Sequence, residues 1–240
     1  MNTDSATIEE VLSDLRTWFT ARFDHLRKLS DELIAQLSFD ANGAIDLTES
    51  TKRRLKASAI KFLADNAVVD GCGLIFAHSA LGTANGHLEW WVREEESRFA
   101  RYSFGVVPGA DRYYDYEQHE WFIRAFHDGT AALVGPYIDY LGIEVYVMTL
   151  TLPAVVAGKR VGAVGNDIQV EDMERELLPM LLRCPTEAVL VNRHGTVLLG
   201  NSARFLPGER VSNDATDFDR LALEPTAGEM ELLVFRRQRG

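Results

Sequence analysis

The sequence predicts an α+β protein in which a long N-terminal helix is followed by an antiparallel sheet and a small second β lobe. Three observations favour this class. Apolar residues between positions 8 and 33 recur four and three apart, which is the spacing of one helix face. Two β-rich runs, 145–152 and 161–168, are separated by the turn residues Gly158-Lys159, as in a hairpin. A second hairpin pattern covers residues 188–199.

The first element is a helix over residues 5–37, for which Ser5 is a suitable N-cap. At 1.5 Å per residue it would be about 50 Å long, which is more than one small domain needs. Its apolar face is interrupted only at Arg22. This length and spacing favour a homodimer formed through residues 8–33. Packing of the same face along its own domain is an equally open alternative.

The elements that follow are predicted from short apolar or periodic runs bounded by turn residues. Helices are predicted at 48–64, 120–127 and 169–182, and Pro179 should kink or end the last of them. Strands are predicted at 68–77, 88–92, 99–104, 131–134, 221–223 and 229–235. Residues 79–87 are predicted to form a loop. The strand at 68–77 contains two glycines, so we expect it to bend or to be approached closely by another segment. Trp90 or Trp91 would reach a binding site, and core packing is expected for at least one of them.

Five aromatic rings and three carboxylates lie within the ten residues from Tyr113 to Phe122. Rings beside acids can form a site for a small cation, because a cation over an aromatic face gains about 0.5–2 kcal/mol. The alternative is that the rings belong to the core and the acids face water.

The order of these motifs resembles the Cache family, the PAS-like sensor domains of bacterial receptors, over about residues 5–180. Tyr114 is followed five residues later by His119-Glu120-Trp121-Phe122, and then come Pro136-Tyr137-Ile138-Asp139 and Gly165-Asn166-Asp167 in the family's order. The resemblance implies a PAS-like antiparallel sheet and a non-catalytic ligand sensor, similar to stand-alone cytoplasmic Cache-domain proteins of bacteria.

Carried over to this sequence, the family's ligand pocket would contain Tyr114, His119, Trp121, Phe122, Tyr137, Asp139 and Asp167. In amino-acid-binding members an Arg at the His119 position binds the ligand carboxylate, and the two Asp bind its ammonium group. A guanidinium is always charged and pairs bidentately with a carboxylate, whereas an imidazole is mostly neutral at pH 7. We therefore expect a cationic amine as the ligand, with an α-amino acid or a carboxylate as the alternative.

Several function classes are disfavoured by composition and motifs. A formal charge of −11 argues against nucleic-acid binding. The six histidines lack metal-ligand spacing, and no nucleophile-elbow or phosphate-loop motif is present, so no catalysis, metal or cofactor is expected. An enzyme acting on the same kind of small molecule is the alternative.

Location is predicted from two features that the sequence lacks. It has no apolar run of about 18 residues and no N-terminal pattern of a signal peptide, so we expect a cytoplasmic protein without membrane contact. Cys72 and Cys184 should then be reduced and buried.

The predicted domain organisation is a Cache-like ligand-binding domain at 1–182, which includes the long helix, and a small PAS-like β lobe at 183–240. Fifty-odd residues are few for an independent core, so the lobe should dock against the first domain. The sequence contains no recognisable output domain. A transcription regulator or another signalling protein is therefore the expected partner, besides a second copy of the chain.

Overall fold

The computed structural model of the chain describes residues 3–102, 105–110, 113–138, 145–212, 217–223 and 230–236. The chain divides into two compact units. Asp24–Val134 and Thr149–Ile168 form the first, here called the central unit. Met1–Phe23, Gly135–Met148 and Gln169–Gly240 form the second, here called the C-terminal unit. The predicted boundary between residues 182 and 183 stays a prediction.

The long N-terminal helix is confirmed as α1 (Thr3–Ile34). Six apolar residues of the 4-3 face point into the chain's own core and are at most 3% exposed, whereas Ile8 is partly exposed. The six are Leu12, Leu15, Phe19, Leu26, Leu29 and Leu33. Most of this face is therefore covered within one chain. Packing of this face within the chain is observed, and the homodimer through residues 8–33 stays a prediction.

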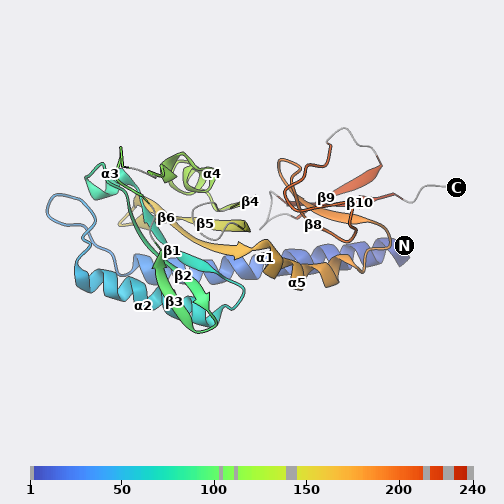
Figure 1. The fold of residues 1–240 in the computed structure, drawn as a ribbon, viewed down its shortest axis with the longest axis horizontal. Helices are drawn as coiled ribbons and strands as arrows, with labels where there is room; N and C mark the ends of the chain where they lie inside the picture. The colour runs from blue at the N-terminus through green and yellow to red at the C-terminus, as the bar shows by residue number, and fades with distance from the viewer. Residues whose placement is uncertain are drawn as a thin grey trace. The chain divides into compact units, whose positions relative to one another are not determined.

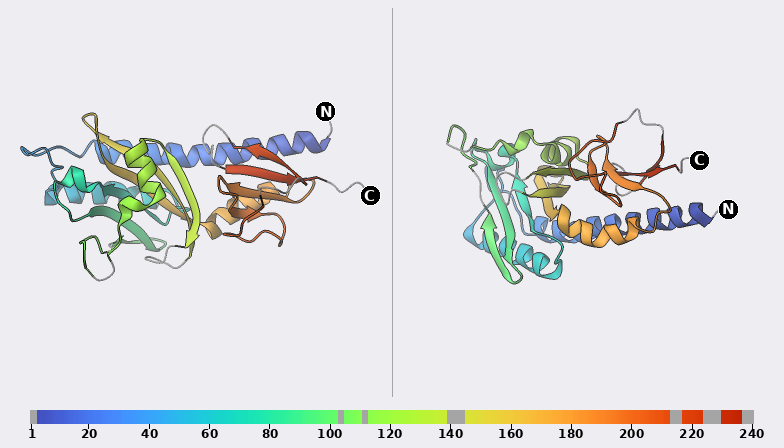
Figure 2. Two further views of the ribbon diagram at one scale, coloured as in Figure 1. Left: turned by 90° about the horizontal axis from the view of Figure 1, so that it is seen from above. Right: turned by 45° about the vertical axis from the view of Figure 1, so that its right-hand side comes forward.

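Arg22, the polar break in this face, has a defined role in the C-terminal unit. Its guanidinium lies 4.7 Å from the centre of the Trp18 ring and 3.2 Å from a carboxylate oxygen of Glu176 in α5 (Val170–Leu181). Trp18 donates its indole N–H to the same Glu176. These contacts hold α5 alongside the N-terminal part of α1 (Figure 2). Pro179 is tolerated inside α5, which ends two residues after it.

Six strands form one antiparallel sheet in the order β3-β2-β1-β6-β5-β4. Their bounds are β1 (Gly71–Phe76), β2 (His87–Glu95), β3 (Arg98–Tyr102), β4 (Ala132–Ile138), β5 (Tyr146–Val156) and β6 (Lys159–Gln169). The strand expected at 131–134 is longer than predicted, because β4 continues through the cis peptide bond Gly135-Pro136. The loop expected at 79–87 instead begins with a helical turn, α3 (His78–Leu81).

The two faces of this sheet are covered by different helices. Figure 1 shows α2 (Glu49–Asp65) on one side and α4 (Glu120–Phe122) on the other. On the α2 side, here called the helix face, Cys72 donates its thiol to the carbonyl of Ala59 at 3.5 Å. Trp91 is the antiparallel partner of Cys72 and shares this face. Cys72 and Cys184 are both buried and unbonded, as predicted.

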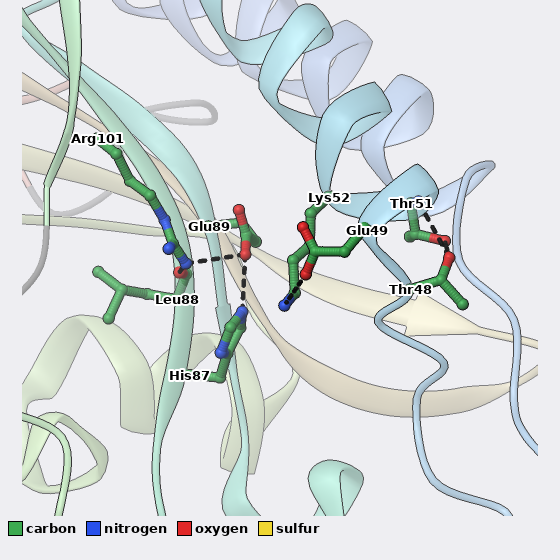
Figure 3. Close-up of polar contacts among 8 residues, drawn as sticks. All are labelled: Thr48, Glu49, Thr51, Lys52, His87, Leu88, Glu89 and Arg101. Atoms are coloured by element: carbon green, nitrogen blue, oxygen red, sulfur yellow. Dashed lines mark hydrogen bonds and ion pairs between the residues drawn. The ribbon is translucent and has the colours of Figure 1, made fainter.

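A buried carboxylate also lies on the helix face (Figure 3). The side chain of Glu89 is 2% exposed and accepts from Nε2 of His87 at 2.7 Å and from Arg101 at 2.9 Å. Arg101 also donates to the carbonyl of Leu88 at 3.1 Å. The start of α2 lies nearby, where Thr48 caps the helix. Since a buried charge is tolerated only when it is paired, these contacts explain how Glu89 fits an otherwise apolar face.

Close approach between strands explains the glycines of β1. Gly73 has φ +155°, and a Cβ there would lie 2.0 Å from the carbonyl oxygen of Glu89. Only glycine fits such a position, because any side chain would overlap the backbone of β2. This confirms the expectation that the strand is closely approached.

The C-terminal unit contains a second antiparallel sheet in the order β8-β7-β10-β9. Its strands are β7 (Ala188–Asn192), β8 (Val197–Gly200), β9 (Phe218–Ala222) and β10 (Met230–Phe235), close to the predicted positions. One apolar cluster lies on it, formed by Val189, Val191, Val197, Phe205, Phe218 and Leu233.

Asn192 connects this sheet to β4 within the same unit. Its side-chain oxygen accepts from the backbone N–H groups of His194 and Thr196, and its Nδ2 donates to the carbonyl of Gly135 at 2.5 Å. The same side chain therefore closes the β7–β8 turn and binds the residue before Pro136. Within the described residues, no helix is long and apolar enough to cross a membrane.

We predict that Gly73→Ala lowers the free energy of unfolding by about 3 kcal/mol or more, because it combines a backbone conformation unsuited to alanine with a clash against β2. Gly43→Ala is the matched control. Gly43 also has a positive φ, +81°, but none of the described residues would come within 4 Å of a Cβ added there. This variant should cost about 1 kcal/mol. Urea unfolding measures both, and equal losses would contradict the clash.

We predict that Leu26→Ala lowers the free energy of unfolding by about 2–5 kcal/mol, independently of protein concentration, because Leu26 is fully buried within one chain. The exposed Lys28→Ala on the same helix should change stability by less than about 0.5 kcal/mol. Denaturant unfolding at two concentrations a hundredfold apart checks this. A midpoint for the wild type that rises with concentration would instead support a dimer.

Candidate functional site

The sheet face opposite α2 carries the predicted acid Asp167, and is here called the site face. Thr149 on β5 donates its hydroxyl to Oδ1 of Asp167 on β6 at 2.6 Å. Thr149 is only 3% exposed, so its position is fixed by packing. One oxygen of the carboxylate is thereby oriented by a neighbouring strand.

Glycines and one tryptophan make up the surface beside Asp167. Gly71 is its antiparallel partner on β1, and Gly73 is paired with Gly165. At Gly71 and Gly73 of β1 and at Gly165 of β6, this face of the sheet therefore has no side chain. The ring of Trp90 from β2 covers the space, with atoms 2.8 Å from a Cβ built on Gly71 and 3.5 Å from one built on Gly165. The prediction that at least one of Trp90 and Trp91 packs in the core holds for both, at 6% and 2% exposure.

The aromatic stretch is anchored to the sheet at two ends. Tyr116, in the short turn η1 (Tyr116–Gln118), donates its hydroxyl to the carbonyl of Phe76 at 2.6 Å, at the end of β1. Thr151 on β5 donates to the carbonyl of Trp121 at 3.0 Å. Thr149 and Thr151 are two residues apart on one strand and so share the site face. Strand β5 thus links Asp167 to the aromatic stretch.

Three rings of this stretch lie nearly parallel. His119 has an extended backbone between η1 and α4, with φ −85° and ψ 141°. Its ring centre lies 4.4 Å from that of Tyr114 and 6.1 Å from that of Trp121, at interplanar angles of 25° and 13°. The stack presents ring faces and one imidazole.

Phe122 lies deeper than these three rings. It is 0% exposed and meets Tyr116 and Trp121 edge-to-face, at centroid distances of 5.3 and 5.8 Å. Phe126, in the π-helical turn η2 (Ile123–Asp128), lies 5.4 Å away. Phe122 therefore supports the ring stack from below, and a direct contact between Phe122 and a ligand stays a prediction.

The environment of His119 favours its neutral form. Burial lowers the pKa of His119, and the nearby carboxylate of Asp115 opposes this only partly. Because the ordinary pKa of histidine is about 6.5, a lowered value leaves the imidazole uncharged at pH 7. A ligand carboxylate would then find no positive charge at this position.

Two predicted site residues, Tyr137 and Asp139, come from the Pro136–Asp139 segment and not from the aromatic stretch. Tyr137 lies on β4, which is the sheet neighbour of β5, and it is half-buried within the C-terminal unit. Asp139 lies outside the described residues. The structure thus brings Tyr114, His119 and Trp121 together and orients Asp167, while the roles of Tyr137 and Asp139 stay predictions.

Sequence reasoning missed Thr149 and Thr151. Their signal was visible as two hydroxyl residues at alternate positions in the apolar run 145–152, where both are now found buried. A buried hydroxyl in a central strand needs a partner, and these two residues find theirs in the site. Among the described residues, no group of three or more His, Cys, Asp or Glu is placed to hold a metal ion.

Comparison with known proteins identifies the fold. Residues 61–175 match the family model of the first PDC sensor domain of methyl-accepting chemotaxis protein-like proteins. No curated protein gives a significant sequence match. The fold is similar to the ligand-binding domain of the Pseudomonas aeruginosa amino acid chemoreceptor PctC in complex with GABA, with TM-score 0.60, 16% identity, and coverage of 94% of this chain and 95% of that one.

Two further solved structures are similar. The ligand-binding domain of the Pseudomonas fluorescens chemoreceptor CtaA, in complex with L-valine, has TM-score 0.60 and 15% identity over 99% of this chain and 98% of that one. That of the Campylobacter jejuni chemoreceptor Tlp3, in complex with 4-methylisoleucine, has TM-score 0.62 and 11% identity over 97% and 88%. Residues 61–175, which contain the six-stranded antiparallel sheet, thus match a PDC sensor domain, and the chain has the α+β fold of PDC/Cache ligand-binding domains.

Proposed function

We propose that this protein is a non-catalytic sensor that binds a small organic amine on the site face and signals to a partner protein. The observation that carries the proposal is the carboxylate of Asp167, oriented by Thr149 on the face that also holds the stack of Tyr114, His119 and Trp121. An oriented acid and aromatic faces are the two groups that favour an ammonium ion.

The comparison with related folds supports the ammonium end of this ligand. GABA and L-valine, which the PctC and CtaA structures contain, each carry an ammonium group and a carboxylate. We infer that this chain keeps the means to bind the first group through Asp167, with Asp139 as a second proposed acid. It lacks a guanidinium at position 119, and the lowered pKa of His119 leaves the imidazole uncharged. An amine therefore fits better than an α-amino acid.

The proposal also includes a partner protein that receives the signal. A sensor domain needs a reader of its ligand state, and we propose a signalling protein such as a transcription regulator for this role. The cytoplasmic location also stays a prediction. The second candidate is an enzyme that converts the same ligand, and mass spectrometry separates the two: an amine incubated with the sensor is recovered unchanged.

We predict that amines raise the melting temperature of the wild type, whereas simple carboxylates do not at pH 7.5. A ligand at a hundred times its dissociation constant stabilises the fold by about 2.7 kcal/mol, or about 5–10 °C for a chain of this size. Asp167→Ala and Asp139→Ala should abolish the shift, because they remove the acids that pair with the ammonium.

Asp128→Ala is the control for this experiment, since Asp128 is an exposed acid of the same unit and is not one of the proposed site residues. It should leave the shift unchanged. L-valine outcompeting isobutylamine, its decarboxylated counterpart, at pH 7.5 would overturn the preference for an amine. Conversion of an amine that is lost in Asp167→Asn would overturn the non-catalytic function.

We predict that the charge at position 119 decides whether a carboxylate is accepted. His119→Arg should strengthen L-valine binding at pH 7.5 by about 1.5–3 kcal/mol, because it introduces a charged hydrogen bond. In the wild type, L-valine binding should strengthen as the pH falls below about 6.5 towards the lowered pKa of His119, and His119→Gln should show no such change. Isothermal titration calorimetry measures both, and an equal pH dependence in His119→Gln would contradict this role.

The same lowered pKa has a consequence for stability without ligand. The lowered pKa of His119 contributes to the free energy of unfolding. This contribution is fully present above the unfolded-state pKa of about 6.5, and it is lost as the pH falls through the lower pKa of the folded state. His119→Gln should remove this part of the acid destabilisation, as urea unfolding at pH 7.5 and pH 5 would measure.

A further inference from the structure

A groove of about 420 Å³ lies in the C-terminal unit, between α5 and the segment that follows β8. Leu178 and Leu182 line it from α5. Phe205, Leu206 and Pro207 line it from the other side. All the residues that line this groove belong to the C-terminal unit, so its walls are set by the packing of that unit alone.

The two most exposed large apolar side chains of the described residues both line this groove. Leu182 is 61% exposed and Leu206 is 55% exposed. The next, Val107 at 48%, belongs to the central unit. Single exposed apolar residues are common on protein surfaces, whereas apolar residues that share one patch mark interaction sites. The groove therefore has apolar surface that the chain itself leaves open.

The polar side chains of the groove are already used within the fold. Asn201 donates its amide N–H groups to two backbone carbonyls, each at 3.1 Å, and its oxygen accepts from a backbone N–H at 2.8 Å. Ser202 donates its hydroxyl to Glu187 at 2.7 Å. A small-molecule site needs free polar groups and encloses about 70–90% of the ligand surface. Walls that are more than half exposed, as at Leu182 and Leu206, fit a larger partner better.

The α5 wall has the shape that a second helix can lie along. Glu174, Leu178 and Leu182 follow one another at intervals of four residues, so they lie in one row along the helix. From first to last this row is about 12 Å long. An amphipathic helix binds such a groove with apolar residues spaced three and four apart.

The charges around the groove are negative. Of the described residues that line it, Glu174 alone is charged, and its exposed carboxylate has no ion pair or hydrogen bond within the described part of the chain. A carboxylate oxygen of Glu209 lies 3.5 Å from the backbone nitrogen of Leu206. Arg204, a cation of the same segment, is paired with Glu187 at 2.6 Å. Charge complementarity therefore favours a basic partner.

We propose that this groove binds an amphipathic helix of the partner protein, whose aliphatic side chains fill the space between Leu182 and Leu206 and whose Lys or Arg pairs with Glu174. This rests on the proposed function, in which a partner protein receives the signal, and it names the surface and the chemistry of that contact. Neither the ring stack nor Asp167 takes part in it, so the two binding events are measured separately.

Three peptides test the chemistry of the groove. The first is an amphipathic helix of about four turns, with leucine on one face and lysine on the other. The second has the same composition in an order that breaks the apolar face, and the third has glutamate in place of lysine. Fluorescence anisotropy at about 0.15 M salt, where attraction between distant charges is screened, measures the affinities. The first peptide should bind about tenfold more tightly than either of the others.

Four substitutions assign this binding to the groove. Leu182→Gln and Leu206→Gln keep the charge and remove apolar surface, so each should weaken the lysine peptide about tenfold. Glu174→Lys should weaken the lysine peptide and strengthen the glutamate peptide. Glu10→Lys is its control, with the same change of charge at an exposed acid of the same unit outside the groove, and it should do neither. Val107→Gln, the control for the leucines, should bind within about twofold of the wild type.

The possible results separate this proposal from the amine sensor. Absence of peptide binding, equal binding of the amphipathic and reordered peptides, or an equal loss in Val107→Gln overturns the docking groove, and the amine-induced melting shift still decides the sensor. Peptide binding by a protein that no amine stabilises keeps the groove and overturns the sensor. A wild-type dimer in light scattering that dissociates in Leu206→Gln assigns the groove to a second copy and overturns the partner helix. If Leu182→Gln does not fold, the opposite effects of Glu174→Lys on the two charged peptides decide the question.

Discussion

The antiparallel pairing of β1 with β6 at the centre of the sheet is the constraint on which the rest of the central unit depends. It sets Gly71 opposite Asp167 and Cys72 opposite Asn166, so neighbouring residues of one strand face opposite sides of the sheet. One face receives α2 and a mostly apolar core. The other receives the aromatic stretch and keeps glycines where side chains would otherwise fill the surface. A register shift of one residue would exchange the two faces and remove Asp167 from the rings.

The polar groups on the two faces of the sheet have different kinds of partners. Glu89 on the helix face is held by His87 and Arg101, which provide a paired environment for a buried charge. On the site face, the contacts from Thr149 and Thr151 orient a carboxylate and a backbone segment. Burial of His119 works in the same direction, because it removes a charge from this face instead of adding one. Among the described residues, the hydroxyls of Thr149 and Thr151, the ring stack and the carboxylate of Asp167 therefore organise the site face.

Much of this arrangement was predictable from local patterns. The 4-3 spacing in residues 8–33 predicted α1, and the turn Gly158-Lys159 predicted the β5–β6 hairpin. The same spacing could not tell a dimer seam from a face covered within one chain, because both require the same apolar residues. The order of motifs indicated His119 and Asp167, but the hydroxyl partners in β5 and the direction of the Trp90 ring depend on strand register. Register is a property of paired strands and is not encoded in any one of them.

The side chain of Asn192 links the C-terminal sheet to β4 by a hydrogen bond. Its amide donates to the carbonyl of Gly135, 57 positions earlier in the chain, while its oxygen closes the β7–β8 turn. A displacement of β4 near Pro136 must either carry this turn with it or leave a buried amide without its acceptor, at a cost of about 1–3 kcal/mol. The β7–β8 turn and the backbone at Gly135 are therefore expected to move as one piece within the C-terminal unit.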